Sequence, residues 1–135
     1  MNVFFDVDFT LITWDYRLRP YVREVFARLR AEGHTIYLWS GVGKRWEVVQ
    51  RFGLEAFVTD CFDKPLFGHA ERLAELGVTV YPDFVVDDYA EPVAAFGGYH
   101  IPPPRSPLAE DDEMLRVYEA IRAHAARMGG AQAAD

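Results

Sequence analysis

Short apolar runs alternate along this 135-residue chain with stretches in which apolar residues recur every three or four positions. Each apolar run is bounded by polar residues or glycine, a pattern typical of buried strands. We expect strands at residues 2–6, 35–39, 56–59, 83–87 and 99–101. Helices are predicted at 18–29, 44–52, 68–76 and 114–128, with a further helix beginning near Ala90. Gly33, Gly53 and Gly77 each follow a predicted helix, where glycine suits the conformation that ends one.

Strands that alternate with helices predict an α/β fold: a three-layer, Rossmann-like parallel sheet of about five strands with helices on both faces. A chain of this length forms one domain around one core. We assign residues 1–128 to that domain, with the three prolines at 102–104 as an extended linker within it. Residues 129–135 are interpreted as a flexible C-terminal tail.

The composition is that of an ordinary globular protein, with 50% hydrophobic and 15% aromatic residues. A formal net charge of -7 argues against a general nucleic-acid binder. No apolar run approaches the roughly 20 residues that a membrane helix requires, and the N-terminus lacks the pattern of a secretory signal. Cys61 is the only cysteine and can form no internal disulfide, which fits a cytoplasmic protein.

Two pairs of carboxylates stand at the ends of predicted strands. Asp6 and Asp8 close the first apolar run, and Asp87 and Asp88 close the run at 84–86. In open parallel sheets, ligands bind at the carboxyl ends of the strands. Strands that bring carboxylates to the same edge therefore predict a site for a hard cation and a phosphoryl group.

A serine and a lysine complete the pattern, because Ser40 follows the second predicted strand and Lys64 follows the third. Phosphoryl transfer has a use for each residue type. One carboxylate can attack phosphorus, and a second can protonate the leaving oxygen and then activate water. Magnesium offsets the repulsion between an anionic nucleophile and an anionic substrate. A lysine and a hydroxyl can hold the remaining phosphate oxygens.

Taken in this order, the residues resemble the motifs of the haloacid dehalogenase-like superfamily of phosphohydrolases, over residues 2–105. The run from Asp6 to Leu11 is similar to the first motif, which is specific when it lies on an N-terminal strand. Ser40, Lys64 and the pair at 87–88 are similar to the second, third and fourth motifs. The superfamily implies the same α/β fold, a Mg2+ cofactor and a phosphorylated substrate.

The resemblance also implies a role for each matching residue. Asp6 would be the nucleophile and a magnesium ligand. Asp8 would be the general acid and base, and its backbone carbonyl would also bind the metal. Asp88 would be the direct metal ligand of the acidic pair, with Asp87 in the next shell and paired with Lys64. The division between these two carboxylates stays open at this point.

Four residues would surround the phosphoryl group. Thr10, Ser40, Gly41 and Lys64 are assigned to phosphate binding, with Thr10 also shaping the loop after the first strand. Ser40 has an alternative interpretation as an ordinary helix cap. The acid at Asp8 resembles the phosphatase branch of the superfamily, because members that cleave carbon–halogen bonds lack it.

Two features bear on the substrate. Phe9 stands where many relatives have glycine, and it is similar in this respect to magnesium-dependent protein-tyrosine-phosphatase-like members, which have tyrosine. The intervals from Asp6 to Ser40 and from Ser40 to Lys64 each hold little more than a helix and a strand, so neither has room for a cap domain. We therefore expect an open site, unless a homodimer partner covers it. The sequence names no substrate, small or macromolecular.

Two other functions compete with the phosphatase interpretation. The first is a phosphate- or phosphoprotein-binding module that keeps the fold with weak catalysis, although both Asp6 and Asp8 are present. The second is a response-regulator receiver domain, which also combines carboxylates, magnesium, a hydroxyl and a lysine. Its residues follow a different order, because here the second acidic pair comes after Lys64 rather than before it.

Charged and aromatic residues near the motifs have two interpretations each. The cations could recognise a second anionic group of a substrate, although exposed loop charge is the commoner explanation; they are Arg17, Arg19, Lys44 and Arg45. The aromatic residues form either a rim for a ring or packing between loops; they are Trp14, Tyr16 and Trp46. Asp60 and Asp63 are interpreted as loop residues, and Cys61 as a buried filler.

Overall fold

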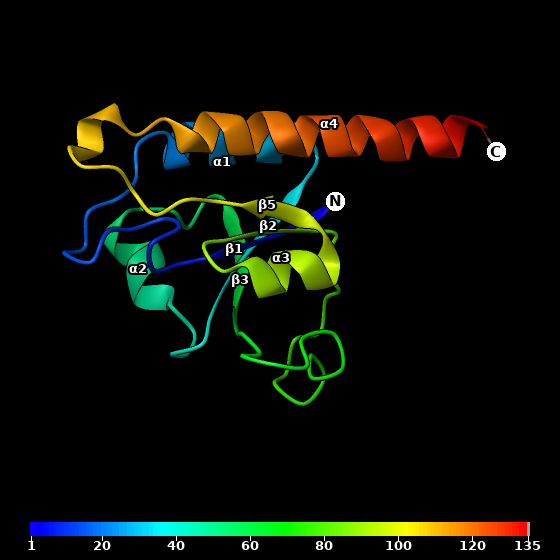
Figure 1. The fold of residues 1–135 in the computed structure, drawn as a ribbon, viewed down its shortest axis with the longest axis horizontal. Helices are drawn as coiled ribbons and strands as arrows, with labels where there is room; N and C mark the ends of the chain where they lie inside the picture. Colours follow the sequence, from blue (N-terminus) through cyan, green and yellow to red (C-terminus); the bar gives the residue numbers. More distant parts are fainter. Residues whose placement is uncertain (135) are drawn as a thin grey trace.

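Five parallel strands form the centre of the molecule (Figure 1). The computed structural model describes the backbone of residues 1–134 and the side chains of residues 1–129. The strands are β1 (Asn2–Asp6), β2 (Thr35–Ser40), β3 (Val58–Asp63), β4 (Phe84–Asp87) and β5 (Gly98–His100). They lie in the order β3-β2-β1-β4-β5, and every neighbouring pair is parallel. The predicted α/β fold with a parallel sheet is confirmed.

The strand order places a switch point beside β1. The chain moves outward from β1 through β2 to β3, then returns to add β4 on the other side of β1. In doubly wound sheets of this order, the connections at the carboxyl edge diverge at the switch point and leave a crevice where ligands bind. Here that crevice lies at the ends of β1 and β4.

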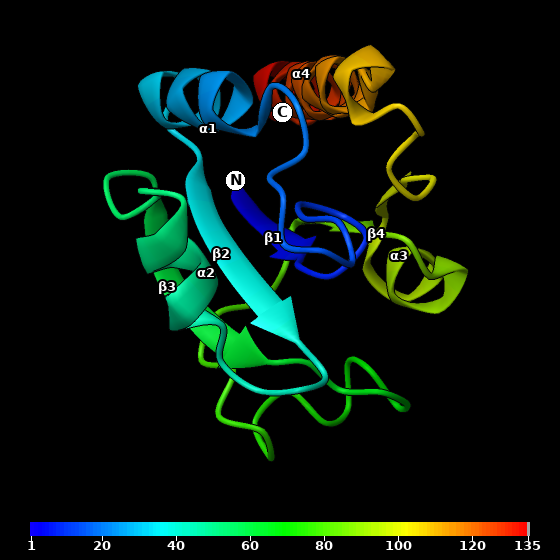
Figure 2. The same cartoon turned by 90° about the vertical axis from the view of Figure 1, so that its left-hand side faces the viewer.

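Helices and turns cover both faces of the sheet. The helices are α1 (Val22–Ala31), α2 (Trp46–Arg51), α3 (Ala90–Phe96) and α4 (Glu113–Ala134), with a short 3-10 helix at Leu108–Glu110. Helices α1 and α4 lie side by side on one face (Figures 1 and 2). The other face is covered by α3 and by the turn-rich segment between β3 and β4. Within the described residues, no helix is both long enough and apolar enough to cross a membrane.

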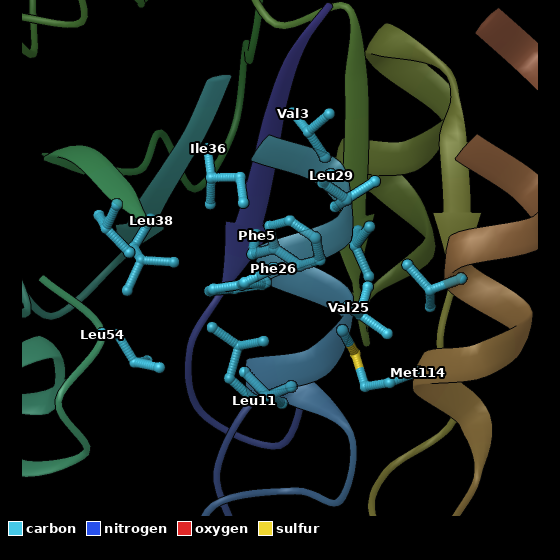
Figure 3. Packing of buried hydrophobic residues seen from close by; sticks show 14 of the residues in the cluster. Val3, Phe5, Leu11, Val25, Phe26, Leu29, Ile36, Leu38, Leu54 and Met114 are labelled. Atoms are coloured by element: carbon cyan, nitrogen blue, oxygen red, sulfur yellow. The ribbon is translucent and has the colours of Figure 1, made fainter. Parts of the chain in front are cut away.

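The central strand β1 is buried on both sides, which explains why its residues 3–5 are all apolar. Val3 and Phe5 point to the α1 face and join the larger core, with Phe26 of α1 packed against Phe5 at a ring-centroid distance of 4.9 Å (Figure 3). Phe4 points to the opposite face. There it packs against Trp39 at 4.8 Å, in a smaller aromatic core.

Several predicted elements or bounds are wrong. Helix α1 begins at Val22 rather than at residue 18. No helix forms at 68–76, which consists of turns, because Leu73 is the only buried apolar residue there and a short helix needs a packed face. Strand β3 begins later than predicted and continues through Asp63, which pairs in register with Ser40. Helix α4 extends past the predicted end at residue 128 to Ala134, so most of the predicted tail is helical; Asp135 lies outside the described residues.

A buried ion pair fastens the loop after β1 to the segment after β5. Arg19 donates to both carboxylate oxygens of Asp111, at 2.8 and 2.9 Å, and both side chains are fully buried. The guanidinium also donates to the carbonyls of Thr10 and Pro102, at 3.3 and 2.8 Å. Arg19 is therefore a structural residue, and its interpretation as exposed charge or substrate contact is wrong.

Replacing Asp111 by alanine is expected to lower the free energy of unfolding by about 3–5 kcal/mol, because it leaves the buried Arg19 guanidinium unpaired. Asp112→Ala is the matched control. Asp112 belongs to the same acidic run, but its side chain is 44% exposed, so its loss should cost at most about 1 kcal/mol. Denaturant unfolding at pH 7 measures both variants, and equal losses would contradict the assignment.

The same pair should make stability depend on pH. Burial opposes ionisation of Asp111, but hydrogen bonds from Arg19 and the Arg105 backbone outweigh it and lower the pKa of the carboxyl. A carboxyl with a lowered folded pKa stabilises the protein above its unfolded pKa of about 3.9, and this contribution is lost as the pH falls further. The stability difference between wild type and Asp111→Ala should therefore shrink below about pH 4.

Candidate functional site

The strand ends bring the predicted site residues to one edge of the sheet. Asp6 ends β1, Ser40 ends β2, and Asp87 ends β4. Lys64 directly follows β3, and its backbone N–H donates to the Ser40 carbonyl at 2.9 Å. The parallel register thus turns residues far apart in sequence into neighbours at the switch point.

Lys64 joins two of the carboxylates. Its Nζ donates to Asp6 Oδ1 and to Asp87 Oδ2, both at 3.0 Å, and all three side chains are buried. Burial raises the pKa of Asp6 to about 7, although the charge of Lys64 opposes the rise. Burial also disfavours the charge of Lys64, but the two carboxylates outweigh it and raise the pKa of the ammonium.

The two members of the acidic pair have different surroundings. Both oxygens of Asp87 have donors, from Lys64 Nζ and from the Tyr89 backbone N–H at 2.9 Å. Asp88 Oδ1 is buried and has no hydrogen-bond partner among the described residues. The Asp88 carbonyl accepts a hydrogen bond from His100 Nε2 at 2.9 Å, which helps to hold the turn after β4.

Three carboxylates could hold a hard cation. Asp6, Asp87 and Asp88 each offer an oxygen, and these oxygens lie within 4.8 Å of one another. One ammonium does not balance three carboxylates at a buried edge, and the unpaired oxygen of Asp88 is left for a further ligand. Oxygen donors of this kind suit Mg2+ or Ca2+. The fit favours Asp88 as the direct ligand and Asp87 as its neighbour held by Lys64.

Asp8 is held by Arg45, which the sequence left as either a contact for a substrate anion or an exposed loop charge. Arg45 Nη1 donates to Asp8 Oδ2 at 2.5 Å. The same guanidinium donates to Glu47 Oε1 at 2.6 Å and to the Tyr16 hydroxyl at 2.8 Å. Arg45 is buried, so its interpretation as exposed loop charge is wrong, whereas Asp8 keeps 44% of its side chain exposed.

The residues predicted to bind phosphate fall into two groups. Ser40, Gly41 and Lys64 line a pocket of about 250 Å³, together with the carboxylates of Asp6, Asp8 and Asp88. Ser40 Oγ also accepts a hydrogen bond from the Val42 backbone N–H at 3.3 Å, which shapes the turn after β2. Thr10 is fully buried behind the pocket and donates to Asp6 Oδ2 at 3.3 Å. This geometry does not support a direct phosphate contact by Thr10, and it makes Thr10 a support for Asp6.

Phe9 has an unusual backbone for its residue type. Its φ of +62° lies in the left-handed region, where a side chain costs about 1–2 kcal/mol relative to glycine. Phe9 is 42% exposed and lines the pocket. The conformation explains why glycine suits this position, and the strain is located at the candidate site.

Four residues outside the pocket can now be placed. Lys44 is exposed, and within the described residues its side chain makes no hydrogen bond or salt bridge. Asp63 ends β3 at the same sheet edge but does not line the pocket, and since Asp60 is also on β3, the interpretation of these two as loop residues is wrong. Cys61 is buried in the core, where burial raises the pKa of its thiol to about 12, so it is an inert filler.

The arrangement is a buried carboxylate cluster with one lysine, open to a pocket at the switch point of a parallel α/β sheet. Comparison of the chain with models of known protein families and with curated proteins gave no match. Chemically, the cluster can place a cation and an anionic group next to the carboxylate of Asp6. Thr10 and Lys64 each hydrogen-bond one oxygen of this carboxylate and so hold it in place.

We expect Mg2+ to raise the unfolding temperature, because a cation that binds only the folded protein stabilises it. A free ligand concentration of 100 times the Kd gives about 2.7 kcal/mol. Asp88→Asn should abolish this rise and, without Mg2+, should be at least as stable as wild type, since it removes an uncompensated charge. Asp63→Asn is the matched control and should keep the rise. Thermal unfolding at constant ionic strength measures all three, and a full response in Asp88→Asn would contradict the assignment.

Proposed function

We propose that the protein is a Mg2+-dependent phosphatase that hydrolyses a phosphomonoester through an aspartyl-phosphate on Asp6, as its resemblance to haloacid dehalogenase-like phosphohydrolases implies. The observation that carries the proposal is the position of Lys64 Nζ, 3.0 Å from both Asp6 and Asp87 at the edge of the pocket. A lysine held between a candidate nucleophile and a candidate metal site suits charge stabilisation of a phosphoryl group.

Asp6 acts as the nucleophile in this proposal. Its carboxylate attacks phosphorus, and the bond between phosphorus and the leaving-group oxygen breaks as the acyl-phosphate bond forms. Thr10 and Lys64 each occupy one of its oxygens and so fix its orientation. A nucleophile held in this way at the pocket is positioned for in-line attack, which phosphoryl transfer requires.

Asp8 acts first as acid and then as base. It gives a proton to the leaving oxygen, and in the second step it takes a proton from the water that attacks the acyl-phosphate and releases phosphate. Arg45, fixed by Glu47 and Tyr16, holds the Asp8 carboxylate and is a positioning residue. Ser40 and Gly41 line the pocket where the phosphate oxygens would lie.

A bound Mg2+, held by Asp6 and Asp88 with the Asp8 carbonyl, would supply positive charge for the phosphoryl oxygens. The intervals between the motifs hold no inserted domain in the described chain, which favours an open site. The single, buried Cys61 is consistent with a cytoplasmic enzyme.

The direct test is hydrolysis of an aryl phosphate with and without Mg2+. Wild type should be active only with Mg2+, and Asp6→Asn should lose at least about 10³-fold in kcat/KM, because the nucleophile is removed. Asp63→Asn, a neutralised carboxylate at the same sheet edge, should remain near wild type. Full activity in Asp6→Asn would overturn the proposal, and an inactive wild type that still binds phosphate would favour a binding module.

Arg45→Ala should lower kcat by about 10- to 100-fold with little change in KM, because Asp8 would lose the group that orients it. Arg45→Lys should restore only part of kcat, since a lysine cannot reproduce the bonds to Glu47 and Tyr16. The pH dependence of kcat should change in both variants. An effect on KM alone would assign Arg45 to substrate binding instead.

A further inference from the structure

A second, larger pocket adjoins the 250 Å³ pocket that Asp6 and Asp8 line, and Phe9 lines both pockets. Its volume is about 450 Å³, which is within the range of small-molecule binding sites. One wall comes from the loop after β1, including Thr13, Trp14 and Arg17, and the other from residues 103–108 after β5. None of the roles assigned so far uses this pocket.

The two walls are joined by a buried linkage rather than by loose loop contacts. Arg19 holds the Thr10 and Pro102 carbonyls at the base of the two walls. Its partner Asp111 accepts a hydrogen bond from the Arg105 backbone N–H at 2.8 Å. The buried pair of Arg19 and Asp111, which fastens the loop after β1 to the segment after β5, therefore also holds the two walls of this pocket together.

The first wall has a further set of internal bonds. Thr13 Oγ1 accepts a hydrogen bond from the Arg17 backbone N–H at 3.0 Å and donates to Asp15 Oδ1 at 2.5 Å. The Thr13 backbone N–H donates to the Arg17 carbonyl at 2.9 Å. These bonds hold the loop in place although Trp14 on it is 80% exposed.

The lining combines aromatic rings with cations. Trp14 and Phe9 are both exposed, and exposed aromatic faces of this kind stack on planar rings. Arg17 is paired with Asp15, but Arg105 makes no salt bridge among the described residues, although Asp112 is near enough for Arg105 to lower the pKa of that carboxyl. In a protein with a formal charge of -7, arginines in a pocket point to an anionic ligand.

We propose that this pocket is the leaving-group subsite, and that it selects phosphomonoesters whose leaving group carries a planar ring and a second anionic group. The inference rests on the proposed phosphatase function, because it names the substrate class of that same site. The ring lies against Trp14 and Phe9, and the second anion lies at Arg105. Phe9 separates the phosphoryl position from the ring position, which gives its strained backbone a use.

Binding can be tested without turnover by calorimetric titration of a naphthol sulfonate, which carries the ring and the anion but no phosphate. Wild type should bind it more tightly than the unsulfonated naphthol. Trp14→Ala and Arg105→Ala should each weaken binding of the sulfonate about tenfold, the size expected for one stacked ring or one charged hydrogen bond. Arg122→Ala, an exposed arginine on α4 remote from the pocket lining, is the matched control and should bind as wild type does.

The substrate preference follows from hydrolysis of naphthyl phosphate with and without a sulfonate on the ring. The ratio of the two kcat/KM values should favour the sulfonated ester in wild type and fall about tenfold in Arg105→Ala, but not in Arg122→Ala. Both variants should keep the wild-type unfolding temperature, because Arg105 and Arg122 are exposed.

The two proposals fail in different ways. Turnover with the same ratio in wild type and Arg105→Ala, and sulfonate binding unaffected by Trp14→Ala, would overturn the subsite and leave the phosphatase intact. Sulfonate binding that is weakened by both substitutions, in a protein with no Mg2+-dependent hydrolysis, would support the binding pocket and overturn only the reaction.

Discussion

The ammonium of Lys64 is the group that lets buried carboxylates stand together at the sheet edge. Burial raises the pKa of both Asp6 and Asp87, and repulsion from a neighbouring carboxylate adds to the rise. Lys64 follows β3, yet it bonds to residues at the ends of β1 and β4, so one side chain connects strand ends across the intervening β2. Because it offsets two carboxylates and not Asp88, the edge keeps an excess of negative charge. The electrostatics of this edge, rather than the shape of the core, determine which ligands the fold can accept.

The fold could be predicted where burial imposes a simple pattern on the sequence. Residues 3–5 of strand β1 are all apolar because Phe4 and Phe5 meet cores on opposite faces, and the predicted bounds of the strand are those of the structure. Strand β3 was harder to predict, because it lies at the edge of the sheet and carries Asp60 and Asp63. The stretch at 68–76 has a helical spacing of apolar residues, but only Leu73 is buried, and a spacing without a packed face does not make a helix.

The candidate site, too, could be predicted only in part. The order of the motifs predicts its members, because each follows a strand and parallel strands end at one edge. Contacts between loops leave no comparable signal. Arg17 and Arg19 are two residues apart, yet one is exposed and the other fully buried against Asp111. Arg45 likewise becomes part of the site only through its contact with Asp8, in a loop 37 residues away in sequence.

The pair of Arg19 and Asp111 joins residues separated by 92 positions, the widest separation among the bonds that shape the site. The residues that pair β1 with β2 are much closer in sequence. Closing a long loop of chain costs more conformational entropy than closing a short one. The loop after Asp6 is therefore held in place by a residue that follows Arg19 by 92 positions. Strand β1 is synthesised before Asp111, so the surroundings of its carboxylate are completed only once Asp111 has docked.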